Sequence, residues 1–184
     1  MRPLVAAALV AVSGWAVRDG RAAPIDTALR TRLTALRTPA RDALLEVGTD
    51  LGSLYGVGVV AGTLALAGRP HTARRVGAAG AVAWTLAQVA KPLLPRARPY
   101  EADGAERLVV EPMGSSWPSG HAAVAAAMAA TLARGRGPTA RLLLGGLASA
   151  VGASRVYVGV HYPSDVIAGF GVGGLSAWLV RRIS

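Results

Sequence analysis

The sequence predicts an all-α integral membrane protein: a bundle of six transmembrane helices, with an interfacial amphipathic helix between the first two. Three observations predict this fold, namely six apolar segments, a composition rich in small residues, and charges that alternate from loop to loop. Hydrophobic residues make up 52% of the 184 residues, yet aromatic residues make up only 5%. A soluble core of this size normally needs more large side chains to fill its volume. Apolar helices rich in Ala and Gly instead pack closely against one another within lipid.

The six apolar segments follow one another along the chain, at residues 3–17, 53–68, 74–94, 119–133, 139–158 and 165–180. Several are shorter than the roughly 20 residues that cross a hydrocarbon core of about 30 Å. They must therefore extend by a turn into their flanks, or the bilayer must thin around them. The length of the chain predicts a single membrane-embedded domain over residues 1–184.

The first segment has a second interpretation, because a short apolar stretch after Arg2 also fits a cleaved signal peptide. RAAP, which follows this segment, is a poor cleavage site. Losing the segment would leave five spans and spoil the charge pattern described next.

Charged residues separate onto two sides if the N-terminus is cytoplasmic. The inner side then carries nine arginines and no acidic residue: Arg2, Arg69, Arg74, Arg75, Arg134, Arg136, Arg141, Arg181 and Arg182. All ten acidic residues fall on the outer side: Asp19, Asp26, Asp42, Glu46, Asp50, Glu101, Asp103, Glu106, Glu111 and Asp165. This asymmetry is typical of a six-span protein with both termini in the cytoplasm. A nucleic-acid binder has no reason to alternate its charges in this way, so the net charge of +10 indicates a membrane protein.

The segment between the first two spans, residues 25–47, is amphipathic. Its apolar residues recur at helical spacing: Ile25, Leu29, Leu33 and Leu36. Its arginines lie off that face: Arg30, Arg32 and Arg37. Pro39 interrupts this helix or starts another. Two interpretations stay open, an interfacial helix whose arginines attract anionic lipid head groups and a connector packed over the bundle.

Three polar clusters lie at the ends of apolar segments on the predicted outer side, where ionisable groups are costly and therefore indicate function. The first, KPLLPRARP, carries Lys91, Arg96 and Arg98 and closes with Pro99. Taken alone it is weak evidence, since cations at helix ends commonly extend towards lipid head groups.

The second cluster, SSWPSGHAA, opens the fourth span. Ser119 is the expected N-cap of a helix, whose free N–H groups and positive dipole end favour an anion. Gly120 permits close approach of a phosphate to the backbone, and His121 lies in the first turn. A structural role for this histidine is the alternative.

The third cluster, SRVYVGVHYPSD, joins the fifth and sixth spans. His161 and Asp165 lie four residues apart across Pro163, a spacing that suits the first turn of a helix. Asp165 can then accept a hydrogen bond from one imidazole nitrogen and leave the other nucleophilic. Arg155 adds a planar fork of donors for phosphate oxygens. The alternative is a buried His–Asp pair that holds two helices together.

The three clusters together indicate phosphoryl transfer. Cations stabilise a transition state that spreads negative charge over the equatorial oxygens of phosphorus. Two histidines allow one to attack phosphorus while the other protonates the leaving oxygen.

These motifs resemble a known family. KxxxxxxRP (Lys91 to Pro99), PSGH (Pro118 to His121) and SRxxxxxHxxxD (Ser154 to Asp165) are similar to the three-part signature of the type 2 phosphatidic acid phosphatases. The resemblance is to the branch of bacterial membrane lipid phosphatases, within a superfamily that also holds vanadium-dependent haloperoxidases and bacterial acid phosphatases. The three blocks span about 75 residues, and no signature position departs from the pattern.

The resemblance implies a role for each signature residue. His161 would attack phosphorus to give a phosphohistidine, Asp165 would orient its ring, and His121 would protonate the leaving group and then activate water. The phosphate oxygens would be bound by five residues: Lys91, Arg98, Ser119, Gly120 and Arg155. The resemblance assigns no role to Arg96, which occupies a variable position, and it implies no metal or other cofactor.

The resemblance therefore implies a bacterial membrane lipid phosphatase, and the predicted topology places its site on the extracytoplasmic side of the plasma membrane. The candidate substrates are phosphatidate, phosphatidylglycerol phosphate, a polyprenyl diphosphate and a phosphorylated polyprenyl sugar. The residues that select among these substrates are expected in the amphipathic segment 25–47 and in the loop 100–117. The four acidic residues of this loop either disfavour highly charged head groups or only keep the loop hydrated. A lipid-binding or transporting protein, a lipid phosphotransferase and a haloperoxidase are the alternatives, and the oligomeric state stays open.

Overall fold

The computed structural model describes residues 2–183, and within this range every regular element is a helix. The helices are α1 (Pro3–Arg18), α2 (Ala23–Thr34), α3 (Pro39–Gly48), α4 (Leu54–Leu66), α5 (Pro70–Ala90), α6 (Pro99–Asp103), α7 (Gly120–Leu132), α8 (Pro138–Tyr157) and α9 (Pro163–Ile183). Two 3-10 turns, η1 (Thr49–Gly52) and η2 (Lys91–Leu93), precede α4 and follow α5. The predicted all-α class is confirmed, and a helix occupies each of the six apolar segments.

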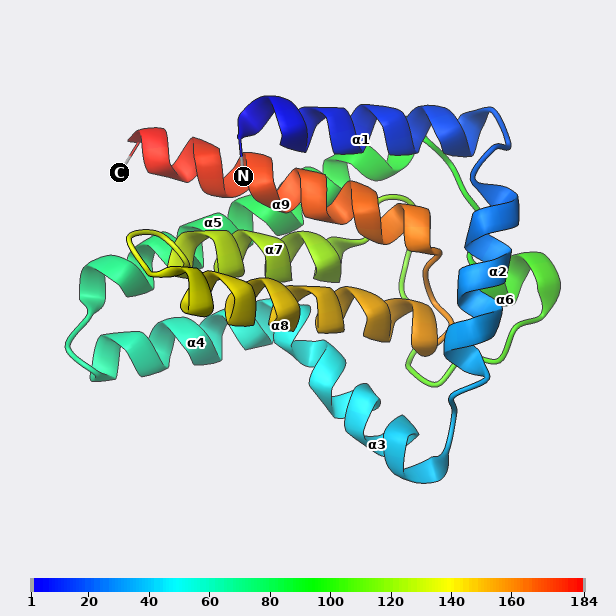
Figure 1. The fold of residues 1–184 in the computed structure, drawn as a ribbon, viewed down its shortest axis with the longest axis horizontal. Coiled ribbons are helices and arrows are strands. Elements are labelled where there is room, and N and C mark those ends of the chain that lie inside the picture. The colour runs from blue at the N-terminus through cyan, green and yellow to red at the C-terminus, as the bar shows by residue number, and fades with distance from the viewer. Residues whose placement is uncertain (1, 184) are drawn as a thin grey trace.

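The long helices run alongside one another and form one bundle (Figure 1). Helix α7 lies at its centre, against α5, α8 and α9, while α1 packs along α9 and α4 packs against α5. The core is lined mainly by Ala and Val side chains, so the helices approach closely. A Cβ atom at Gly173 would lie only 2.2 Å from the carbonyl oxygen of Ala123. The abundance of small residues in the sequence thus corresponds to backbone contact between α7 and α9.

Length and hydropathy single out α9 as the one helix within residues 2–183 able to cross a membrane unaided. The segments Pro39–Gly52 and Leu54–Leu66 meet the same criteria jointly, with a bend of 70° between them. Helices α1 and α7 are apolar but have only 16 and 13 residues. Helices α5 and α8 have 21 and 20 residues, but each carries arginines within its length. The count of six spans and the topology stay predictions.

The outer amphipathic segment forms two helices, α2 and α3. Pro39 starts the second of them, after Thr38, whose hydroxyl accepts a hydrogen bond from the amide of Arg41 at 3.4 Å. Helix α2 contacts α8 and α9 and lies across the end of the bundle (Figure 1). The segment is therefore packed over the bundle, as one of the two interpretations proposed.

The orientation of α2 differs from the simplest expectation for an amphipathic helix. Ile25 is 63% exposed, whereas the adjacent Asp26 is buried. Arg30 of α2 pairs with Asp103 of α6, and Arg37, which follows α2, pairs with Glu106 of the loop before α7. These two arginines are engaged within the protein, so a role in attracting lipid head groups falls to the exposed Arg32 alone among the three. A position of α2 at the membrane interface stays a prediction.

Candidate active site

The three polar clusters meet at the end of the bundle that α2 crosses. Lys91 begins η2 directly after α5, Gly120 begins α7, and Arg155 lies in the last turn of α8. Pro163 begins α9, as the spacing of the third cluster predicted, and places Asp165 in its first turn. Helix ends and short loops from four different helices therefore supply the site (Figure 1).

A cavity of about 430 Å³ opens at this end of the bundle. It is lined by ten residues: Trp84, Gln88, Lys91, Arg98, Pro112, Met113, Gly120, His121, Arg155 and His161. Six of these were predicted as site residues, and they come from all three clusters. The other two predicted residues, Ser119 and Asp165, are fully buried behind the cavity wall.

Three cations face this cavity without a carboxylate partner. Arg98 Nη1 donates to the carbonyl oxygen of Val160 at 2.9 Å, and its Nε donates to that of Gly114 at 3.1 Å. Lys91 Nζ donates to the carbonyl oxygen of Ser115. Arg155 Nη1 donates to the hydroxyl of Thr49 at 2.8 Å. Because neutral oxygens hold all three cations in place, their positive charge stays available to an anion in the cavity.

The positive charge of Lys91 depends on pH within the physiological range. Burial, together with a smaller effect of the neighbouring Arg98 charge and against the opposing effect of Asp165, lowers the pKa of Lys91 to about 8. The ammonium group is therefore half deprotonated at a pH near this value, so the positive charge of the cavity falls as the pH rises through it.

His161 presents a neutral ring to the cavity. Burial lowers its pKa to about 4, against the opposing effect of the Asp165 carboxylate. Its Nε2 lies 3.5 Å from Arg98 Nη1. At neutral pH the ring therefore carries a lone pair that can act as a nucleophile.

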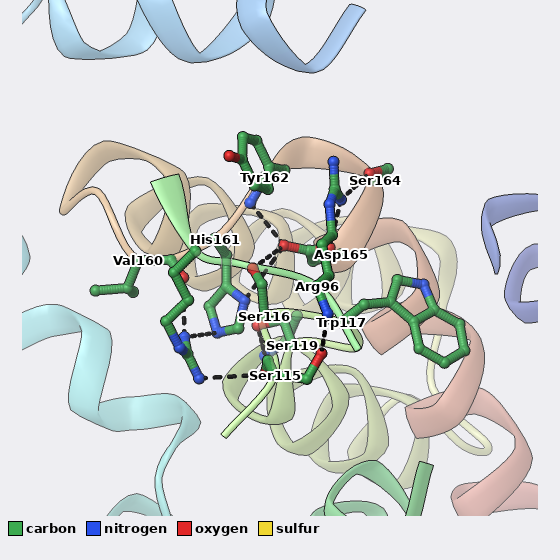
Figure 2. Close-up of polar contacts among 12 residues, drawn as sticks. Arg96, Ser115, Ser116, Trp117, Ser119, Val160, His161, Tyr162, Ser164 and Asp165 are labelled. Carbon is green, nitrogen blue, oxygen red and sulfur yellow. Dashed lines mark hydrogen bonds and ion pairs between the residues drawn. The ribbon is translucent and has the colours of Figure 1, made fainter. Parts of the chain in front are cut away.

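The carboxylate of Asp165 is held by partners other than His161. Its Oδ2 accepts hydrogen bonds from the Ser116 hydroxyl at 2.5 Å and the Tyr162 amide at 2.8 Å, and its Oδ1 accepts one from Arg96 at 2.6 Å (Figure 2). The distance from Oδ2 to His161 Nδ1 is 3.6 Å, which is longer than a hydrogen bond. The expected direct hydrogen bond is thus replaced by an electrostatic contact, because two other donors already occupy Oδ2.

The start of α7 brings His121 beside the cavity. Ser119 caps the helix as predicted, its hydroxyl accepting a hydrogen bond from the amide of Ala122 at 3.4 Å. Its own amide donates to the carbonyl oxygen of Asp165 at 3.0 Å, which ties the starts of α7 and α9 together. The hydroxyl therefore stabilises the helix start, and its contact with phosphate stays a prediction. The His121 ring lies edge-to-face with Trp84, with 6.0 Å between ring centroids.

Arg96 forms part of the site, although the sequence motif assigned it no role. Its guanidinium bridges two buried carboxylates, donating to Asp165 and to Asp26 at 2.6 Å each. Asp26 also accepts hydrogen bonds from the amide and hydroxyl of Ser164, at 2.9 and 2.6 Å. The guanidinium lies 4.0 Å from the centre of the Tyr162 ring. Helix α2 is thereby connected to the first turn of α9, beside the predicted nucleophile.

The sequence did not predict the site roles of Thr49 or of two residues of the cavity wall. Thr49 in η1 binds both Arg155 and, at 3.0 Å, the hydroxyl of Ser154. Trp84 and Gln88, one turn apart on α5, form part of the cavity wall. An isolated threonine between two segments, or an isolated tryptophan or glutamine within an apolar segment, carries no pattern that distinguishes it from a packing residue.

The acidic residues of the loop before α7 have partners within the protein. Glu101 accepts a hydrogen bond from the amide of Arg98 at 2.6 Å, while Asp103 and Glu106 pair with Arg30 and Arg37. The carboxylate of Glu111 lies 3.5 Å from Arg107. The pairs with Arg30 and Arg37 fasten this segment to α2 and to the residues that follow α2. Pro112 and Met113 are its contribution to the cavity wall.

Comparison with known proteins agrees with this arrangement. The family model of the PAP2 superfamily matches residues 72–184. An undecaprenyl-diphosphatase of Sulfolobus acidocaldarius is 38% identical over 104 residues, which cover 55% of this chain and 50% of that protein. A decaprenylphosphoryl-5-phosphoribose phosphatase of Mycolicibacterium smegmatis is 38% identical over 109 residues, or 59% of this chain and 58% of that protein. The chain thus spans about half the length of the curated relatives it matches.

Two solved structures share the fold. A transmembrane PAP2-type phosphatidylglycerolphosphate phosphatase from Bacillus subtilis superimposes with a TM-score of 0.80 at 24% identity, covering 99% of this chain and 95% of that one. Aquifex aeolicus LpxE superimposes with a TM-score of 0.75 at 24% identity, covering 86% and 95%. The likeness extends beyond the residues matched by the family model and includes the N-terminal helices.

Proposed function

This chain belongs to the PAP2 superfamily, and on that premise we propose that it is a membrane lipid phosphatase that hydrolyses a terminal phosphate through a phosphohistidine at His161. The observation that carries the proposal is the cavity in which Lys91, Arg98 and Arg155 face two histidines without any carboxylate partner. A phosphate group entering this cavity would meet three cations and the free amides at the start of α7.

The proposed reaction has two steps. Nε2 of His161 attacks phosphorus, the bond to the leaving oxygen breaks, and His121 gives its proton to that oxygen. His121 then takes a proton from water, whose oxygen attacks phosphorus, and the P–N bond breaks to release inorganic phosphate. The negative charge of the bound phosphate favours the protonated form of His121 before the first step. The three cations stabilise the charge that develops on the equatorial oxygens, so the mechanism needs no metal ion.

Asp165 is proposed to stabilise the imidazolium that forms on His161 during attack. Its carboxylate is fully buried and lies 3.6 Å from Nδ1, the ring nitrogen that faces away from the substrate. The hydrogen bonds from Ser116 and Tyr162 fix its position before the reaction starts. The stabilisation therefore requires little reorganisation when the charge appears.

The proposed substrate is a lipid that carries a terminal phosphate monoester or diphosphate, with polyprenyl-linked phosphates as the first candidates. Both curated relatives are named for polyprenyl phosphates. The protein is proposed to cross the bacterial plasma membrane several times, with both termini in the cytoplasm and the cavity on the extracytoplasmic side. The placement of all three motifs at one end of the bundle supports a site on one side of the membrane, and the predicted charge asymmetry makes that side the extracytoplasmic one.

The test is phosphate release by the purified protein in detergent, with EDTA present. The panel contains phosphatidate, phosphatidylglycerol phosphate, a polyprenyl diphosphate and a phosphorylated polyprenyl sugar. His161→Ala should abolish release from every lipid, whereas His71→Ala, an exposed histidine at the start of α5, should leave it unchanged. Equal release by the His161 variant, or loss of activity with EDTA, would overturn the proposed mechanism. No release from any lipid would favour a binding or transporting protein.

A further inference from the structure

A second pocket lies at the opposite end of the bundle from the candidate active site. It has a volume of about 760 Å³ and is bounded by α5, α7, α8, α9 and the loop that joins α7 to α8. This loop and the C-terminal end of α9 lie far from α2 (Figure 1). None of the residues predicted for phosphoryl transfer lines this pocket, so it is separate from the candidate active site.

The pocket is strongly basic. Five arginines line it, two from the loop between α7 and α8 and one each from α5, α8 and α9: Arg134, Arg136, Arg75, Arg141 and Arg181. The sequence has no Asp or Glu between residues 51 and 100, between 112 and 164, or after 165, and these ranges include every lining residue. Within residues 2–183, no ion pair joins Arg134, Arg136, Arg141 or Arg181 to a carboxylate. Like charges around one hollow repel one another, so the arrangement favours a bound anion.

Ordinary roles account for only part of this charge. Arg136 Nε donates to the carbonyl oxygen of Leu132 at 3.0 Å and so caps the end of α7. A preference for positive residues in cytoplasmic loops explains why arginines occur on this side. That preference acts on the loops as a whole, however, and gives no reason for five arginines to surround one hollow between helices.

The remaining walls suit a phosphate attached to an apolar body. Thr72 contributes a hydroxyl, while Leu132 and Trp178 contribute apolar surface. Guanidinium groups bind phosphate oxygens through paired N–H donors. Basic pockets between transmembrane helices on the cytoplasmic side bind phospholipid head groups.

We infer that this basic pocket is a second anion site, which binds a phosphate group carried by an anionic phospholipid of the inner leaflet or free in solution. The lipid source rests on the membrane topology proposed above, whereas the free anion does not. The four helices that bound the pocket carry Lys91, His121, Arg155 and Asp165 at or directly after their opposite ends. A bound phosphate would therefore bridge the helices that position the candidate active site and raise the stability of the bundle.

The test compares thermal unfolding in nanodiscs of phosphatidylcholine with and without phosphatidylglycerol, which has no terminal phosphate to hydrolyse. A second arm adds inorganic phosphate to discs of phosphatidylcholine alone. The variant is Arg134→Gln with Arg141→Gln, and the matched control is Arg69→Gln with Arg74→Gln, which removes the same charge from the same end outside the pocket. Phosphate binding at the active site is common to all of these proteins, so the difference between them isolates the pocket.

A ligand at about tenfold excess over its Kd should raise the Tm of the wild type and the control by about 3–6 °C. The rise in the pocket variant should be smaller by about this amount. A difference between the control and the pocket variant that appears with phosphatidylglycerol alone identifies the lipid head group, and one that appears with inorganic phosphate identifies the free anion. Equal shifts in the pocket variant and the control, or no shift in either arm, would overturn the inference. Phosphate release from the lipid panel is measured separately, in phosphatidylcholine discs. The absence of release by the wild type would count against the proposed function and would leave the second anion site untouched.

Discussion

The bridging position of Arg96 makes its replacement by glutamine an informative perturbation. The change removes the one cation that donates to both Asp165 and Asp26, at 2.6 Å each. The side chains of the two aspartates are 0% and 2% exposed, so neither carboxylate reaches bulk solvent once the guanidinium is removed. Removing one partner of a buried ion pair typically costs about 3–5 kcal/mol. For a chain of this size, that cost corresponds to a fall in Tm of roughly 6–20 °C.

The remaining hydrogen bonds place the expected loss at the lower end of this range. Asp165 keeps its bonds from Ser116 and Tyr162, and Asp26 keeps its two bonds from Ser164. Activity should fall as well, because Asp165 would no longer be anchored on the Oδ1 side. We expect kcat to fall about 10- to 100-fold, which corresponds to roughly 1.4–2.8 kcal/mol. KM should change little, since Arg96 does not line the cavity.

The assay combines thermal unfolding with steady-state phosphate release for Arg96→Gln, Asp26→Asn and the double variant. In the double variant one uncompensated carboxylate is gone, so it should be more stable than Arg96→Gln alone. Arg32→Gln, an exposed arginine on α2, serves as the control and should behave as the wild type. A Tm for Arg96→Gln within about 2 °C of wild type, or strictly additive effects in the double variant, would refute the reasoning.

Three further predictions follow from single contacts. Because the pKa of Lys91 is lowered to about 8, KM should rise as the pH increases through that value. In a KM profile from pH 6.5 to 9.5, Lys91→Arg should remove this rise. A flat profile for the wild type would contradict the prediction. Thr49→Ala removes the 2.8 Å hydrogen bond to Arg155 and should lower kcat/KM about tenfold, whereas Thr49→Ser should retain most of it, and equal rates for both would contradict this role. Gly173→Ala would place a Cβ atom 2.2 Å from the α7 backbone and should lower the free energy of unfolding by about 1–3 kcal/mol. Gly145→Ala, whose Cβ would have no atom within 4 Å, should be neutral or stabilising. A larger loss of stability for Gly145→Ala than for Gly173→Ala would show that α7 and α9 can separate freely.

Much of the fold could be predicted from short stretches of sequence. Apolar segments of 15 or more residues placed all the long helices, and Pro39, Ser119 and Pro163 marked helix starts that the structure has. These predictions succeeded because helix formation and capping depend on residues within one or two turns of each other. The motifs also singled out the residues that gather around the cavity, since each motif ends or begins a helix on the same side of the bundle.

The partners of these residues were decided only by the tertiary structure. Arg96 meets Asp26 and Asp165 from 70 and 69 positions away, and Thr49 meets Arg155 from 106 positions away. The inward turn of Asp26 and the exposure of Ile25 likewise reverse what the periodicity of α2 alone suggested. Periodicity describes how one helix divides its polar and apolar faces. It carries no information about which charged group from elsewhere in the chain packs against that face. In this protein such a group, Arg96 in the loop before α6, makes the burial of Asp26 favourable.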